Sequence, residues 1–79
     1  MNKQVLHDSY VEGPRWEDFQ GFIKKLAMVH NVDVIITSET KSWLRKTTFF
    51  TVRGTEARIR YFMRILHQSI EEYNCDREI

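Results

Sequence analysis

The clearest pattern in this chain is a helical repeat of apolar residues toward its C-terminus. The apolar side chains recur at intervals of three and four positions, which places them on one face of a helix. This stripe consists of Ile59, Phe62, Met63, Leu66, Ile70 and Tyr73. Thr55 precedes it and suits the helix N-cap, where a hydroxyl accepts a hydrogen bond from an early backbone N–H. We predict a helix that begins after Thr55 and turns the stripe toward the core.

A second helix is predicted from about Pro14 to His30. Proline suits the first turn of a helix, because the N–H that it lacks would have no partner there. The apolar residues again recur at helical spacing and include Trp16, Phe19, Phe22, Ile23, Leu26 and Val29. On the C-terminal helix a shorter apolar line, Tyr61 and Ile65, is expected to pack against this helix or to face another molecule.

Other segments have the alternation and the β-branched content of strands. Val32 to Thr37 and Thr47 to Val52 are the clearest of these. The polar residues between them predict a β-hairpin whose turn lies between Glu39 and Trp43. A weaker pattern from Val5 to Val11 is compatible with a short edge strand.

The resulting order of strand, helix, strand, strand, helix predicts an α+β fold. We expect a small two-layer sandwich, in which a three-stranded sheet with a β-hairpin is covered on one face by two helices. If the first crossover is right-handed, the third strand lies between the first and the second. The N-terminal strand is then an exposed edge, and we expect it to support a weak homodimer.

Composition limits the chain to one small domain, residues 1–79. With 79 residues, 42% of them hydrophobic and 13% aromatic, it can build one core but not two. The single cysteine, Cys75, excludes an internal disulfide. Met1 to Gln4 lack the apolar segment of a signal peptide, and no apolar run reaches the roughly 20 residues of a membrane span. We expect a soluble, cytoplasmic protein with no membrane partner.

Positive charge is concentrated in one stretch of the chain. Between Lys41 and Arg64 there are seven basic residues and one acid, Glu56, whereas acids outnumber bases on both sides. Such a segment can attract an anionic partner. The candidate binding residues are Lys41, Trp43, Arg45 and Lys46 on the hairpin, and Arg53, Arg58, Arg60 and Arg64 on the last strand and the start of the following helix.

Both groups of candidates have more than one interpretation. Trp43 can stack on an unpaired base while its basic neighbours bind phosphates, it can anchor a protein interface, or it can pack over the sheet edge. The arginines can grip phosphate or carboxylate groups, or they can form ion pairs with acids of their own chain such as Glu56 and Glu71.

These features predict a small non-enzymatic binding or regulatory protein. The leading hypothesis is that the basic hairpin and helix start contact nucleic acid, mainly through phosphate. The alternative is a protein interaction module, an adaptor or inhibitor that docks by its sheet edge or hairpin onto a larger acidic partner. The three histidines share no metal-ligand spacing, and the sequence has no glycine-rich phosphate loop and no nucleophile elbow. We therefore expect no metal, no cofactor and no catalysis.

Overall fold

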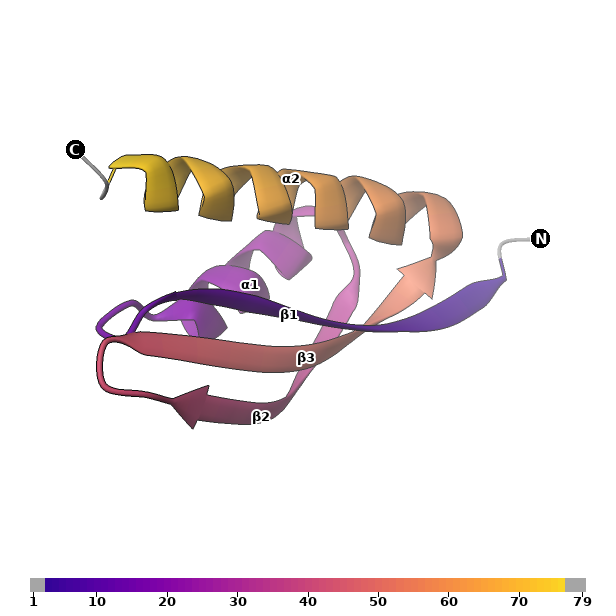
Figure 1. Ribbon diagram of the computed structural model, residues 1–79. Helices are drawn as coiled ribbons and strands as arrows, with labels where there is room; N and C mark the ends of the chain where they lie inside the picture. Colours follow the sequence, from indigo (N-terminus) through magenta and orange to yellow (C-terminus); the bar gives the residue numbers. More distant parts are fainter. Residues whose placement is uncertain (1–2, 77–79) are drawn as a thin grey trace.

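The computed structural model describes the backbone of residues 3–76 and the side chains of residues 3–71. It is a small α+β domain with three strands and two helices in the predicted order (Figure 1). The elements are β1 (Gln4–Pro14), α1 (Phe19–Val29), β2 (Asp33–Lys41), β3 (Arg45–Thr55) and α2 (Glu56–Asp76).

The three strands form one sheet in the order β1-β3-β2. Both outer strands run antiparallel to β3, so the predicted central position of the third strand is confirmed. Every residue of β1 from Gln4 to Pro14 has a partner on β3. The pairing of β2 with β3 is interrupted once, by a bulge between Ile36 and Ser38.

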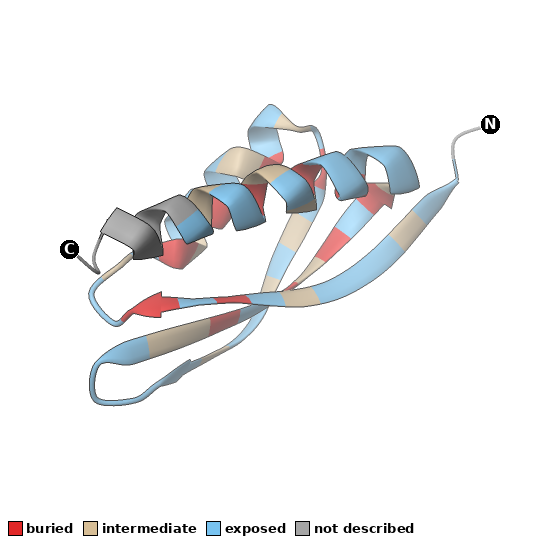
Figure 2. Ribbon diagram, turned by 45° about the horizontal axis from the view of Figure 1, so that its top comes forward, coloured by how far each residue is buried: buried red, intermediate tan, exposed pale blue. Residues whose placement is uncertain are grey.

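One core joins the sheet to both helices. Successive side chains of a strand point to opposite faces, and on β3 the even-numbered positions are the buried ones. Figure 1 shows α2 running along the sheet above β1 and β3, with α1 behind it, and Figure 2 shows buried segments on the helices and strands where they face each other. The buried apolar residues are Val11, Phe19, Ile23, Ala27, Val32, Phe50, Val52, Ile59, Phe62 and Leu66.

The predicted stripe of the C-terminal helix is confirmed within the described residues. Ile59, Phe62 and Leu66 are buried, while Met63 and Ile70 are partly buried against the same core. The side chain of Tyr73 lies outside the described residues. The predicted cap is also present, since the backbone N–H of Arg58 donates to Thr55 Oγ1 over 3.4 Å.

The predicted start of the first helix at Pro14 is wrong. Pro14 is the last residue of β1 and lies opposite Arg45, so the strand continues past Gly13. The helix begins at Phe19 because Asp18 caps it, and the Asp18 carboxylate accepts a hydrogen bond from the Gly21 N–H over 3.0 Å. Trp16 therefore lies before the helix and is 61% exposed, although its spacing placed it on the helical stripe.

The predicted turn between Glu39 and Trp43 is placed too early. Strand β2 continues to Lys41 and β3 begins at Arg45, so only Ser42, Trp43 and Leu44 connect them. The turn is closed by Ser42, whose backbone N–H donates to the Arg45 carbonyl over 2.8 Å. The longer strands leave Trp43 and Leu44 at the tip of the hairpin.

Truncation of a central core residue tests this packing. We expect Leu66→Ala to lower the free energy of unfolding by roughly 2–5 kcal/mol, because Leu66 is fully buried and the change leaves a cavity. Chemical denaturation measures the loss. Leu44→Ala is the matched control, since Leu44 is 62% exposed and should cost less than about 0.5 kcal/mol. Equal losses for the two variants would contradict the packing described.

Candidate binding surfaces

The structure separates the eight predicted binding residues into two groups. Lys41, Trp43, Arg45 and Lys46 lie at the hairpin, whereas Arg53, Arg58, Arg60 and Arg64 lie at the other end of β3 and on α2. Arg45 and Arg53 belong to one extended strand, which places them roughly 26 Å apart at about 3.3 Å per residue. Figure 1 shows the hairpin turn and the start of α2 at opposite ends of the molecule. These residues therefore do not form a single basic surface.

Most of these basic groups are also engaged by other parts of the chain. Each exposed ion pair stabilises the fold by only about 0–1 kcal/mol, but it places a negative charge beside the positive one. This reduces the field that an anionic ligand would meet. The pairs are Arg45 with Glu12 at 3.1 Å, Arg53 with Asp33 at 2.9 Å, and Arg60 with Glu56 at 3.0 Å.

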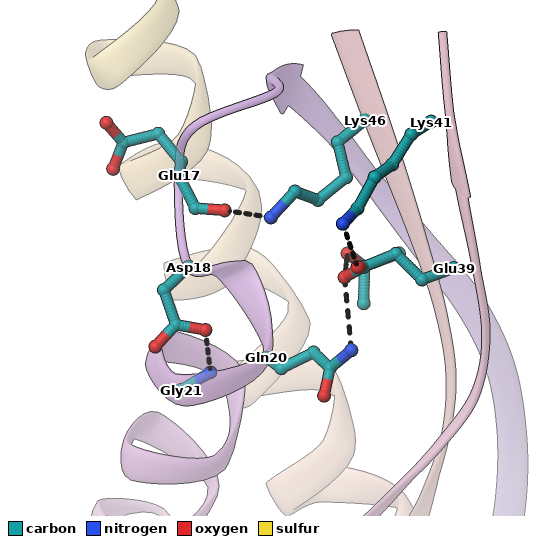
Figure 3. A network of polar contacts seen from close by, with 8 residues as sticks. Glu17, Asp18, Gln20, Gly21, Glu39, Lys41 and Lys46 are labelled. Carbon is teal, nitrogen blue, oxygen red and sulfur yellow. Dashed lines mark hydrogen bonds and ion pairs between the residues drawn. The ribbon is translucent and has the colours of Figure 1, made fainter.

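Lys41 and Lys46 of the hairpin point toward polar groups that lie between the hairpin and the start of α1 (Figure 3). At the centre of this polar network is the Glu39 carboxylate, which accepts hydrogen bonds from the Gln20 amide and the Thr48 hydroxyl, each over 3.1 Å. Lys41 Nζ lies 3.9 Å from the same carboxylate. Lys46 Nζ donates instead to the backbone carbonyl of Glu17. The network thus fastens the first turn of α1 and the preceding loop to the hairpin.

The environment of Glu39 favours its charged form. The hydrogen bond from Gln20 is the largest influence that lowers the pKa of Glu39, followed by the hydrogen bond from Thr48 and the positive charges of Lys46 and Lys41. Partial burial acts in the opposite direction, but it does not outweigh them. Glu39 is therefore a structural carboxylate, held ionised at neutral pH.

The tip of the hairpin exposes large apolar side chains. Trp43 is 86% exposed and Leu44 is 62% exposed. The interpretation that Trp43 packs over the sheet edge does not fit this exposure. The backbone N–H of Arg15 donates to the Leu44 carbonyl over 3.0 Å, which brings the segment containing Trp16 beside the tip. We call Trp16, Trp43 and Leu44 together the tip surface.

The contribution of Trp16 to the tip surface was missed by the sequence analysis. Its spacing to Phe19 and Ile23 fits a helical stripe, and Pro14 fits a first helical turn, so the local sequence does not show that the helix begins only after Trp16. The residues of the tip surface come from two connections, the one after β1 and the one between β2 and β3. These connections meet because the end of β1 pairs with the start of β3.

The sheet face away from the core carries an exposed aromatic pair. Tyr10 on β1 and Phe49 on β3 face each other in the register, and their ring centroids lie 5.9 Å apart. Leu6 and Ile35 are exposed as well, at 70% and 67%. This pair is not apparent from the sequence, because the two rings meet only through the register of β1 and β3. Charged residues of the sheet form pairs of opposite sign, in which Glu12 pairs with Arg45 and Asp33 pairs with Arg53.

The exposed side of α2 carries basic side chains beside Tyr61. Arg64 lies over the ring of Tyr61, with its guanidinium carbon 5.6 Å from the ring centroid. Tyr61 also contacts the imidazole of His30, just after α1, at a centroid distance of 5.2 Å. Tyr61 thus contacts the residue that follows α1, while half of its side chain stays exposed. Arg58 and Arg60 are exposed on the preceding turn.

Within the described part of the chain, no three His, Cys, Asp or Glu side chains gather as they would around a metal ion. No helix among these residues is long and apolar enough to cross a membrane. Comparisons with protein-family models, with curated proteins and with solved structures found no match.

The polar network gives a pH-dependent prediction. Folding lowers the pKa of Glu39. The ionised carboxylate therefore stabilises the folded protein at pH values above its pKa in the unfolded chain. This stabilisation is lost as the pH falls through its pKa in the folded protein. We expect Glu39→Gln to lower the free energy of unfolding by roughly 1.5–3 kcal/mol at pH 7, the scale of hydrogen bonds to a charged group. The difference from wild type should shrink as the pH falls below about 4.

Urea denaturation at several pH values measures this difference. Glu12→Gln is the matched control, because Glu12 lies on the exposed sheet face and should cost less than about 1 kcal/mol. A loss for Glu39→Gln that stays constant from neutral to acidic pH would contradict the assigned role of the carboxylate.

Proposed function

We propose that the protein is a small non-enzymatic binding protein that docks onto a larger protein through its tip surface. The observation that carries this proposal is the exposure of Trp43. This residue lies at the end of the hairpin and is 86% exposed. Tryptophan is the residue type most often found as an energetic anchor in protein interfaces. A side chain so exposed can enter a pocket of a partner without any rearrangement of this domain.

The tip surface is held by features that keep it in place before binding. The Ser42 N–H bond to Arg45 closes the turn, and the Arg15 N–H bond to Leu44 fastens the neighbouring segment to it. The Glu39 network ties the same end of the hairpin to α1. Prior ordering reduces the entropy lost on binding, which favours affinity for a given contact area.

The charges around the tip suggest the chemistry of the partner. Arg15 is exposed beside Leu44, and Lys41 keeps a half-exposed side chain next to the turn. An apolar pocket bordered by carboxylates would accept the indole and attract this rim. Rim charges of this kind mainly increase the rate of association and select among partners.

We further propose that the domain is a two-layer sandwich, in which the helices cover one sheet face and the hairpin extends beyond the core. This arrangement would present the tip as a projecting wedge. Such a wedge can enter a concave site on a larger protein, while the core and the helix packing stay unchanged.

Single-stranded nucleic acid is the second candidate ligand, and one observation favours it. An exposed indole beside Lys41 is suited to stack on an unpaired base, and stacking contributes about 1–3 kcal/mol per base. The arginines of α2 could add phosphate contacts for a longer strand. We rank this candidate second because phosphate binding depends on free positive charge. Arg45, Arg53 and Arg60 are already paired with carboxylates.

A capture experiment tests the leading proposal. Immobilised wild-type protein and the Trp43→Ala variant are exposed to nuclease-treated extract of the native host, and captured proteins are then titrated individually. We expect Trp43→Ala to weaken binding by at least about thirtyfold, the equivalent of roughly 2 kcal/mol for an anchor residue. Ile35→Ala is the control, because Ile35 is an exposed apolar residue on the outer sheet face. Equal binding by all three proteins would contradict the role of the tip.

Binding to oligonucleotides separates the two candidates. Under the leading proposal, random single-stranded and double-stranded oligonucleotides do not bind at about 50 mM salt, where phosphate contacts are least screened. Nucleic-acid binding would instead fall steeply with salt, and Lys41→Gln or Arg58→Gln would each reduce the salt slope by about one unit. That result, together with a loss for Trp43→Ala restricted to single strands, would favour the second candidate.

A further inference from the structure

The two edge strands of the sheet differ in how they are protected against further pairing. Exposed edges are usually blunted by bulges, lysines or prolines, because a regular edge can pair with another strand. Strand β2 has a bulge between Ile36 and Ser38 and ends at Lys41. Strand β1 pairs with β3 without a break over 11 residues, contains no lysine, and has a proline only at its last position. Among the described strands, β1 is therefore the edge suited to pairing.

The hydrogen-bonding pattern identifies which backbone groups of β1 face the open edge. In an antiparallel ladder, alternate residues of a strand bond to the same neighbour. Arg15 donates to Leu44 of the β3 side, so the odd-numbered residues of β1 bond to β3. The even-numbered residues then direct their N–H and C=O groups away from β3. Between the strand ends these residues are Leu6, Asp8, Tyr10 and Glu12.

One antiparallel register of two β1 strands combines full overlap of the strands with the absence of like charges opposite each other. If two copies of β1 pair around a two-fold axis at Ser9, the full strands overlap, because Ser9 is the midpoint of Gln4–Pro14. Leu6 then faces Glu12 of the other copy, and Asp8 faces Tyr10. An axis at Asp8 would instead place two Asp8 carboxylates opposite each other, and an axis at Tyr10 would oppose Asp8 and Glu12. Like charges directly opposite are destabilising.

A groove lies between β1 and α2 beside the same edge. It is lined by the apolar residues Val5, Leu6, Ile59 and Met63, together with His7, Glu56 and Arg60. A second strand added to β1 would cover the open side of this groove. Its apolar lining would add burial of apolar surface to the backbone hydrogen bonds of the new ladder.

We propose that the protein forms a two-fold dimer in which β1 pairs antiparallel with β1 of a second copy, with Ser9 at the axis. The two sheets become one continuous six-stranded sheet. Four residues of each copy, Leu6, Asp8, Tyr10 and Glu12, exchange backbone hydrogen bonds with the other. This interface is independent of the tip surface.

Disulfide trapping tests the register. In the proposed dimer the two Ser9 residues form a non-hydrogen-bonded pair with Cα atoms about 4.5 Å apart, within the range that a disulfide spans. We expect Ser9→Cys, in a Cys75→Ser background, to form a covalent dimer under mild oxidation. His7→Cys is the matched control. His7 faces Val11 of the other copy, so the two new thiols lie too far apart, at about 13 Å along the strand.

A covalent dimer of His7→Cys in place of Ser9→Cys would overturn the proposed register. The absence of covalent dimer for both variants, with wild-type protein that sediments only as a monomer up to about 1 mM, would overturn the dimer itself.

Sedimentation of edge variants tests the role of the backbone. Leu6→Pro removes an N–H that faces the open edge, and proline is tolerated at such positions of edge strands. The two lost bonds per dimer should weaken dimerisation at least about tenfold relative to Leu6→Ala, which keeps the N–H. Circular dichroism checks that Leu6→Pro is folded, and if it is not, the trapping experiment decides alone. Unchanged dimerisation of a folded Leu6→Pro would show that another surface holds the copies together.

Discussion

The structure depends on the central position of β3. From Lys46 to Arg53 this strand lies between β1 and β2, which pair with its backbone groups on both sides. Its even-numbered residues Thr48, Phe50 and Val52 are buried, and its odd-numbered residues Arg45, Phe49 and Arg53 point away from the core. Because the period of a strand is two, a slip of one residue in this strand would exchange these sets and place two arginines in the core. The register of β3 therefore determines both the packing of the helices and the identity of the exposed surfaces.

Much of the fold could be predicted from the sequence. The stripe that contains Phe62 and Leu66 was identified because a long helix repeats its period several times. The position of the third strand followed from the handedness of the crossover. The start of the first helix could not be placed, because Trp16 and Pro14 both fit a helical pattern locally. Pro14 belongs to β1 because it pairs with Arg45, a residue distant in sequence. Such tertiary contacts override local helix propensity.

The candidate surfaces were less predictable than the fold, for a related reason. The charge count between Lys41 and Arg64 is correct, but the charge of a segment is not the charge of a surface. Arg45 meets Glu12 and Arg53 meets Asp33, and both acids come from neighbouring strands, 33 and 20 positions away in the chain. The position of Trp43 in the hairpin turn was expected from the sequence, but its exposure was not, because the indole could also have packed over the sheet edge. The composition therefore indicated which residue types could bind a partner. The register of the strands determined which of these side chains are exposed and which are paired within the chain.

The two proposed surfaces differ in physical character, and their positions are compatible. The tip surface offers apolar side chains on a projecting turn, so its contribution would come from a few anchors that enter a pocket. The β1 edge offers a regular row of backbone groups, so its affinity for a second strand would come from many similar backbone hydrogen bonds. Its specificity would come from the side chains that lie opposite one another. Because Pro14 lies beside the tip and the proposed strands run antiparallel, the two tips of a dimer would lie at opposite ends of the continuous sheet. A dimer would thus present two binding sites on one rigid body. If a partner displays its sites at the matching separation, the second contact becomes intramolecular, and a weak tip could bind with an avidity well above its single-site affinity.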